Sequence, residues 1–118
     1  MNGNDIVIVS ATRTAIGKFG GQFATTSAIE LGTTVAKAAI QKANLSPEQI
    51  DTVIFGNVLQ AGLGQNPARQ VGLGAGLHHT STAVTINEVC GSGLKAIISA
   101  AQVLRLGDAK IVLAGGME

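Results

Sequence analysis

Short apolar runs rich in β-branched residues alternate along this chain with longer segments of helical periodicity. The runs lie at residues 5–11, 51–58, 82–89 and 109–118, and most are nearly continuous in apolar residues. Strands buried on both faces have this composition, whereas strands with one solvated face alternate apolar and polar residues. The sequence therefore predicts an α/β fold with a mostly parallel sheet that helices cover on both faces.

Start and stop signals place helices between these runs. A serine followed three residues later by glutamate or glutamine, or an asparagine followed by proline, satisfies the free N–H groups of a first helical turn. Glycine in turn favours the end of a helix. The sequence predicts a helix capped at Ser27 that ends near Asn44, one turn at 46–49, a short helix between Asn66 and Gly76, and a long helix between Cys90 and Gly107. The predicted order is β-α-β-α-β-α-β.

Composition argues against several classes of function. The 118 residues carry a net charge of +1 and contain no Tyr or Trp, so no nucleic acid is expected as a partner. We see no apolar run of the ~18 residues that a membrane span needs, so no membrane partner is expected. One cysteine cannot form a disulfide within the chain, and the first residues lack a signal-peptide pattern, so we expect a cytoplasmic protein.

The single cysteine, Cys90, lies in "TINEVCGSGLKA", between a predicted strand and a predicted helix. A free cysteine is most often a small buried hydrophobe. Here the short turn places it at the carboxyl edge of the sheet, where open α/β sheets bind ligands. The free N–H groups of the next helix favour a thiolate, and Gly91 and Gly93 permit a sharp turn like the nucleophile elbow of hydrolases. Cys90 is therefore a candidate nucleophile.

The same segment fits a second kind of site. "GSGLKA" has the G-x-G-x-x-A pattern of a dinucleotide-binding loop that follows a strand and opens a helix, with Gly91 and Gly93 as its glycines. Glu118, at the end of the next strand, then stands where a ribose ligand is sought. Two crossovers precede this loop, although the fingerprint usually lies in the first βαβ unit of its domain. A dinucleotide-binding domain remains the alternative from another class.

Four segments, in this order, resemble the N-terminal part of thiolases: "VSATRTAIGKFGG", "VIFGNVLQAGLGQNPARQ", "TINEVCGSGLKAI" and "VLAGGME". The resemblance covers essentially the whole chain, and it departs from the common pattern where Ala15 stands in place of a proline. It implies a thiolase-like layered fold in which Cys90 carries an acyl group as a thioester. The activity it implies is the condensation of two acetyl-CoA molecules to acetoacetyl-CoA and coenzyme A, or the reverse thiolysis.

The resemblance also implies what this segment lacks. Residues 1–118 are expected to be the N-terminal part of the thiolase N-terminal domain, with the loop domain, the C-terminal domain, the activating histidine and a second cysteine beyond Glu118. We therefore expect the 118-residue chain alone to be inactive. We expect no metal and no cofactor, acyl-CoA as the small-molecule substrate, and a homo-oligomer (a dimer or tetramer) as the full-length assembly.

Alternatives remain within and outside this family. A 3-ketoacyl-CoA thiolase of fatty-acid degradation uses the same chemistry on longer acyl chains, and a ketosynthase-type condensing enzyme is a more distant option. A fragment that only mediates interactions would show neither acylation nor cofactor binding.

Other polar residues receive structural interpretations: His78 and His79 in a solvated loop, Arg13 and Lys18 as solvated loop charges, Gln65 and Arg69 as ties between loops or subunits, Asn66 as a helix cap, and Glu118 as structural, near a subunit interface.

Overall fold

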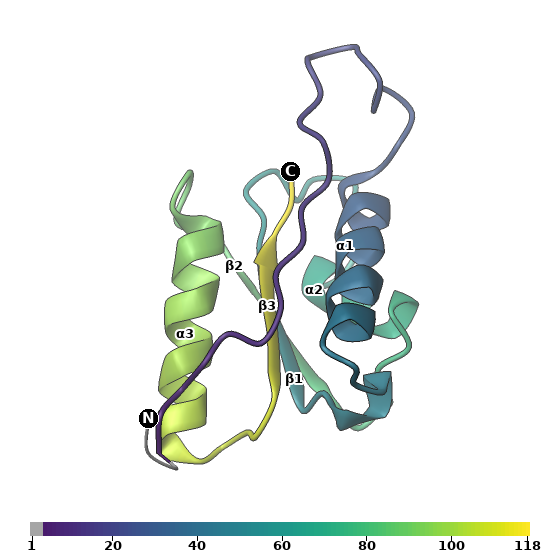
Figure 1. Cartoon of the computed structure of the whole chain (residues 1–118). Helices are drawn as coiled ribbons and strands as arrows, with labels where there is room; N and C mark the ends of the chain where they lie inside the picture. The colour runs from purple at the N-terminus through teal and green to yellow at the C-terminus, as the bar shows by residue number, and fades with distance from the viewer. Residues whose placement is uncertain (1–3) are drawn as a thin grey trace.

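Three parallel strands form the centre of the computed structural model, which describes residues 4–118 (Figure 1). β1 (Thr52–Gly56) lies between β2 (Thr82–Ile86) and β3 (Val112–Gly116). Helix α2 (Pro67–Gly74) connects β1 to β2, and helix α3 (Ser92–Leu106) connects β2 to β3. The predicted parallel sheet with helical crossovers is confirmed.

Helix α1 (Ala28–Lys42) precedes the sheet and begins where the sequence predicts. Ser27 Oγ accepts a hydrogen bond from the backbone N–H of Glu30 at 3.1 Å, and the N–H of Ser27 donates to Glu30 Oε2 at 2.6 Å. This reciprocal pair satisfies two N–H groups of the first turn, so the capping box is confirmed. A single 3₁₀ turn, η1 (Pro47–Gln49), follows and is also as predicted.

The two faces of the sheet bury side chains against different helices. Val53 and Phe55 point from β1 into a core with α1 and α2, whereas Ile54, between them, contacts Ala96 and Ala100 of α3. The alternation follows from the two-residue period of a strand. In Figure 1 α1 and α2 accordingly lie on one side of the strands and α3 on the other. β1 is buried along its whole length.

The predicted strand at residues 5–11 is wrong. This segment is extended but belongs to no strand ladder in the described part of the chain, and Ile8 is 77% exposed. It lies along α1 instead, where Ser10 Oγ donates to the carbonyl oxygen of Ala39 at 2.7 Å. The β-branched composition favours extended backbone, but a strand also needs a neighbouring edge to pair with. The order is therefore α-β-α-β-α-β, with three strands in place of four.

Helix α3 combines a buried face with an exposed apolar face. Ala96 and Ala100 are buried on the sheet, whereas Leu94, Ile97 and Ile98 are exposed. By length and composition alone, the segment Val89–Leu106 is apolar enough to cross a membrane, with a mean hydropathy of 1.2 and 17% of its residues buried. This differs from the sequence prediction that no such stretch is present. The segment is apolar because α3 carries apolar residues both on the face that packs on the sheet and on the exposed face.

Candidate active site

A tight turn at residues 87–91 joins the end of β2 to the start of α3. The N–H of Gly91 donates to the carbonyl oxygen of Glu88, and the N–H of Ser92 donates to that of Val89, both at 3.1 Å. The predicted short turn is confirmed, although β2 ends at Ile86, three residues earlier than expected. Asn87 belongs to the turn, where its Oδ1 accepts a hydrogen bond from the N–H of Val89 at 2.9 Å.

The strained residue of this turn is Val89, not a glycine. Val89 has a φ of 52°, in the left-handed region, whereas Gly91 has an ordinary φ of −85°. A β-branched residue in the left-handed region is an outlier, because its Cβ approaches the following carbonyl oxygen. The prediction that the conformational freedom of Gly91 makes the sharp turn is therefore wrong. The residue directly before Cys90 takes the unfavourable conformation instead.

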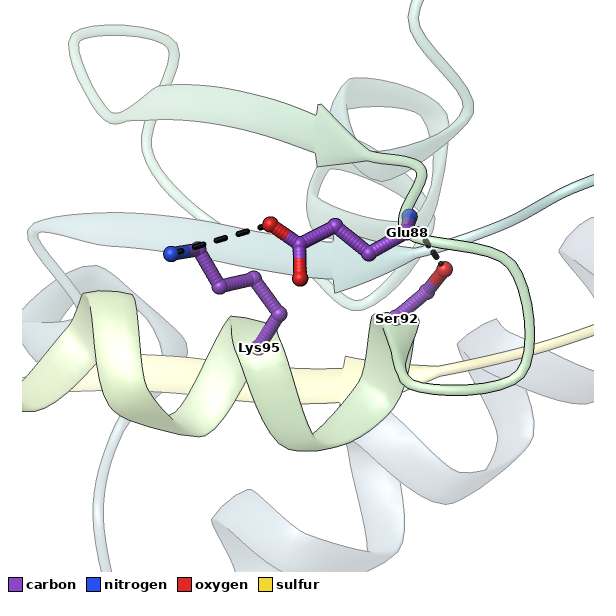
Figure 2. A network of polar contacts seen from close by, with 3 residues as sticks. All are labelled: Glu88, Ser92 and Lys95. Carbon is purple, nitrogen blue, oxygen red and sulfur yellow. Dashed lines mark hydrogen bonds and ion pairs between the residues drawn. The ribbon is translucent and has the colours of Figure 1, made fainter.

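Ser92 holds this turn closed, and sequence reasoning missed its role. Its Oγ accepts a hydrogen bond from the N–H of Glu88 at 2.8 Å and donates one to the carbonyl oxygen of Val89 at 2.6 Å, and the residue is buried. Figure 2 shows Ser92 below the Glu88 backbone, with Lys95 one helical turn further along α3. The Lys95–Glu88 ion pair, at 3.7 Å between exposed side chains, contributes little because water screens it.

Cys90 is exposed and carries a free thiol. It borders a hollow of about 600 Å³ at the carboxyl ends of the strands, whose other walls are residues 56–59 after β1 and 116–118 after β3. The predicted location at the carboxyl edge of the sheet is confirmed. No side chain caps α3, and of the N–H groups in its first turn those of Gly93 and Leu94 remain without a partner in the described part of the chain. A role for Cys90 as a filler of the core does not fit this position.

Close packing of glycines fixes the start of α3 against the sheet. A Cβ added to Gly56 would lie 2.5 Å from the carbonyl carbon of Ser92 and 2.7 Å from the nitrogen of Gly93. A Cβ on Gly116 would lie 3.2 Å from the Cα of Gly93. Distances below 3.0 Å between such atoms are not tolerated without movement, so Gly56 lets the turn that carries Cys90 rest directly on the end of β1.

The side chains of Asn57 and Glu118, 61 positions apart in sequence, join the end of β1 to the end of β3. The carboxylate of Glu118 accepts hydrogen bonds from the backbone N–H groups of Val58 at 3.0 Å and Leu59 at 2.9 Å. Asn57 Nδ2 donates to the carbonyl oxygen of Met117 at 3.1 Å. These contacts form a wall of the hollow beside Cys90. The sequence predicts a structural role for Glu118 and gives no signal for Asn57.

The dinucleotide interpretation requires Glu118 to face a ribose. Both carboxylate oxygens of Glu118 instead accept backbone N–H groups from the segment after β1. Each oxygen of this carboxylate therefore already has a partner within the protein. The geometry therefore gives no support to Gly91 and Gly93 as a dinucleotide-binding loop.

The remaining polar residues lie away from Cys90. His78 and His79 are exposed, with ring centroids 4.2 Å apart, and precede β2, whereas Cys90 follows it, so the histidines lie at the opposite end of the sheet. No group of three or more metal-ligating side chains occurs within residues 4–118. Arg69 donates to the carbonyl oxygens of Ser81 and His79, which confirms it as a tie between α2 and the loop before β2.

Asn66 is the N-cap of α2, as predicted. Its Oδ1 accepts from the N–H of Arg69 at 3.3 Å, and the residue has a φ of 43°. Arg13 and Lys18 line a second hollow of about 550 Å³, which shares the wall at residues 116–118 with the hollow beside Cys90. Arg13 Nη1 donates to the carbonyl oxygen of Thr14, its neighbour in sequence.

The layered α/β arrangement and the cysteine turn at the sheet edge define a thiolase-type N-terminal domain. Residues 6–118 match the family described as thiolase, N-terminal domain, so the chain belongs to the thiolase family. It is 60% identical over 112 residues to an acetyl-CoA acetyltransferase of Escherichia coli K12, covering 95% of this chain and 28% of that protein. It is 53% identical over 113 residues to a cytosolic acetyl-CoA acetyltransferase of Mus musculus, covering 96% and 28%.

A solved structure has the same fold. The crystal structure of Acat5 thiolase from Ascaris suum in complex with coenzyme A is 46% identical, with a TM-score of 0.91, and the match covers 92% of this chain and 28% of that chain. The predicted thiolase-like fold is therefore confirmed. The chain spans less than a third of the length of the curated relatives it matches.

Proposed function

We propose that the full-length protein that contains this segment is an acetyl-CoA acetyltransferase in which Cys90 carries the acetyl group. The observation that carries the proposal is the position of Cys90, an exposed thiol at the uncapped start of α3 beside a hollow at the sheet edge. The relatives in Escherichia coli, Cupriavidus necator and Mus musculus are named acetyl-CoA acetyltransferases, which favours acetyl over longer acyl groups.

The proposed reaction has two half-reactions, as expected for a covalent acyl carrier. The Cys90 thiolate attacks the thioester carbon of acetyl-CoA, a new C–S bond forms, and coenzyme A leaves as a thiolate that takes up a proton. A second acetyl-CoA then loses a proton from its α-carbon to a base outside residues 1–118. The resulting carbanion attacks acetyl-Cys90, which gives acetoacetyl-CoA and returns the thiolate. Thiolysis runs through the same steps in reverse.

Residues of this segment would serve the first half-reaction. The tetrahedral intermediate carries negative charge on the former carbonyl oxygen, and backbone N–H donors stabilise such a charge. The N–H groups of Gly93 and Leu94, at the uncapped start of α3, are the proposed donors, because those of Gly91 and Ser92 already bond to Glu88 and Val89. Ser92 holds the turn through its bonds to Glu88 and Val89, so it fixes where the sulfur stands relative to those donors.

The partners and location of the full-length protein belong to the same proposal. Coenzyme A thioesters are the proposed substrates, and the solved thiolase from Ascaris suum in complex with coenzyme A supports this. A homo-oligomer, dimeric or tetrameric, is proposed from the family resemblance. A cytoplasmic location is proposed because the mouse and rat relatives are named cytosolic.

Steady-state thiolysis tests the proposed activity. The full-length protein should cleave acetoacetyl-CoA in the presence of coenzyme A, and Cys90→Ser should reduce kcat by at least about 10³-fold, because a serine hydroxyl is a far weaker nucleophile than a thiolate. The swap is small, so the thermal unfolding midpoint should remain close to that of the wild type. Full activity in Cys90→Ser would refute the proposal.

A further inference from the structure

Four hydrogen bonds connect the residues that follow β1 to those that follow β3. The N–H of Met117 donates to the carbonyl oxygen of Gly56 at 3.0 Å, and the contacts of Glu118 and Asn57 described above supply the other three. We call residues 56–59 together with 117–118 the β1–β3 latch. All of these residues border the same hollow as Cys90. The latch therefore forms the wall that faces the turn of α3.

We propose that Glu118 and Asn57 are positioning residues for the chemistry at Cys90, acting through the β1–β3 latch. The inference rests on the proposed function, because it concerns the rate of acyl transfer to that sulfur. Neither residue is proposed to contact the reacting atoms. They fix the position of the latch, which is one wall of the hollow, and of Gly56, the end of β1 on which the Cys90 turn rests.

The Glu118 carboxylate supplies two of the four hydrogen bonds of the latch. It accepts hydrogen bonds from two consecutive backbone N–H groups, Val58 and Leu59, at 3.0 and 2.9 Å. Hydrogen bonds to an ionised acceptor are shorter and about twice as strong as neutral ones. Since β1 ends at Gly56, residues 58 and 59 have left the strand ladder, and Glu118 takes the place of a ladder partner for them. The positions of Val58 and Leu59 in this wall therefore depend on the Glu118 side chain.

Gly56 connects the latch to the nucleophile turn. Its carbonyl oxygen accepts the N–H of Met117, and its Cα lies so close to α3 that an added Cβ would be 2.6 Å from the Cβ of Ser92. Ser92 in turn bonds to Glu88 and Val89, the two residues directly before Cys90. A shift of the latch is therefore passed to the turn by direct contact. Displacements near 1 Å reduce rates by about 10²-fold in reactions that depend on orientation.

Asn57 occupies its place at a cost to stability. The side chain is 1% exposed, and its Nδ2 bonds to Met117, which fixes the orientation of the amide. Its Oδ1 is the one buried side-chain polar atom without a hydrogen-bond partner among residues 4–118. A buried unpaired acceptor is unfavourable, and leucine has the same branched side-chain shape without it. The bond from Asn57 to Met117 explains why an amide is retained here, because it aligns residues 56–59 with residues 117–118.

The test uses the full-length protein and two substitutions of one residue. Glu118→Gln removes the charge and leaves one acceptor for two N–H groups, and Glu118→Asp keeps the charge on a side chain one methylene shorter. Both variants should lower the rate constant for acetyl transfer to Cys90 by about 10- to 100-fold, with KM for acetyl-CoA changed less than about twofold. Asp108→Asn, an exposed site with no side-chain bond, removes the same charge and should have no effect.

Three outcomes of this experiment separate positioning from mere stability. A fall in the unfolding midpoint with an unchanged rate per folded molecule would overturn the proposal. Full activity of Glu118→Asp would also overturn it, because charge and not geometry would then be the cause. Asn57→Leu provides a second variant, which keeps the branched side-chain shape and removes the polar atoms. It should fold with a midpoint close to the wild type and still slow acetyl transfer, and an unchanged rate would count against Asn57.

A probe that needs no acyl transfer distinguishes failure of this inference from failure of the proposed function. Iodoacetamide alkylates an exposed thiol in the absence of any enzymatic activity, at a rate that depends on the surroundings of the sulfur. If wild-type protein does not form acetyl-Cys90, the proposed function fails. The latch is then judged by alkylation alone: a severalfold change of the rate constant in Glu118→Gln supports the positioning of Cys90, and an unchanged rate constant overturns it.

Discussion

The hydroxyl of Ser92 donates a hydrogen bond to the carbonyl oxygen of Val89 at 2.6 Å, across the turn that contains Cys90. Val89 stands at a φ of 52°, which a β-branched residue adopts only when its surroundings impose it. The second bond of the same hydroxyl, accepted from the N–H of Glu88, ties the residue before Val89 to the start of α3 as well. Ser92 thus supplies the hydrogen bonds that offset the strain beside the thiol.

Replacement of Ser92 by alanine should destabilise the full-length protein. The N–H of Glu88 loses its partner in a partly buried place, and the carbonyl oxygen of Val89 keeps only the N–H of Ser92, so we expect the free energy of unfolding to fall by about 1–3 kcal/mol. Denaturant unfolding measures this loss. Ser99→Ala, in the same helix at a half-exposed site with no side-chain bond, is the matched control and should change stability by less than about 0.5 kcal/mol. Equal effects of the two substitutions would contradict the assigned role of Ser92.

At Val89, a substitution to glycine should leave the protein more stable than a substitution to alanine, the reverse of the usual order of stability. Val89→Ala keeps a Cβ at a positive φ, whereas Val89→Gly removes the clash that makes this region unfavourable for other residues. Val89 is mostly exposed, so neither variant loses much burial. We expect the glycine variant to be the more stable of the two by about 0.5–1 kcal/mol, measured by chemical denaturation. A more stable alanine variant would show that the turn is not strained.

A methyl group at Gly56 should disrupt the start of α3. The added Cβ meets Ser92 and Gly93 backbone atoms at 2.5–2.7 Å, so strand and helix must separate, and we expect a loss of about 1–3 kcal/mol. Gly91→Ala is the control for stability, because its Cβ would meet only the carbonyl oxygen of Glu88, at 3.5 Å. Calorimetric unfolding of both variants checks this. If Gly91→Ala lowers stability more than Gly56→Ala does, the close contact at Gly56 does not cause the predicted loss.

Asp51 should make part of the stability depend on pH. Its carboxylate accepts hydrogen bonds from the backbone N–H groups of Lys110 and Ile111, and these lower the pKa of Asp51 below its ordinary value. The charged form is therefore favoured in the folded state. The stabilisation is present above the unfolded pKa of about 3.9 and is lost as pH falls through the lower folded pKa.

Asp51→Asn tests this dependence because it keeps an acceptor and removes the charge. The wild type should be more stable than Asp51→Asn at neutral pH, and the difference should vanish as the pH falls below about 3.9. Unfolding midpoints of the two proteins across this range provide the measurement. Asp108→Asn, at an exposed site without side-chain bonds, should show no such convergence. A difference that stays constant down to low pH would contradict the cause assigned to the shift.

Local patterns in the sequence predict the elements that depend on local interactions. The capping box of Ser27 and Glu30 gives the start of α1 because its two hydrogen bonds lie within four residues. The strand at 5–11 is predicted wrongly for the opposite reason. Its composition is that of a strand, but its pairing depends on an edge contributed by distant chain, which no local pattern encodes.

The candidate site divides in the same way. The place of Cys90 follows from the order of β2, turn and α3, which periodicity and the glycines reveal. The contact between Asn57 and Met117 joins residues 60 positions apart, and no spacing rule predicts it. Ser92 had a weak signal, a serine directly inside a helix start, but the pattern is also that of an ordinary cap.

Mapping of the acetyl group tests the central claim most directly. The full-length protein is incubated with acetyl-CoA, quenched at acid pH and digested, and the peptide that contains residues 85–96 is analysed by tandem mass spectrometry. We predict a mass increase of one acetyl group (about 42 Da) on the sulfur of Cys90, with labelling that approaches one group per chain and is removed by added coenzyme A. An unlabelled Cys90 in protein that is active in thiolysis would contradict the account.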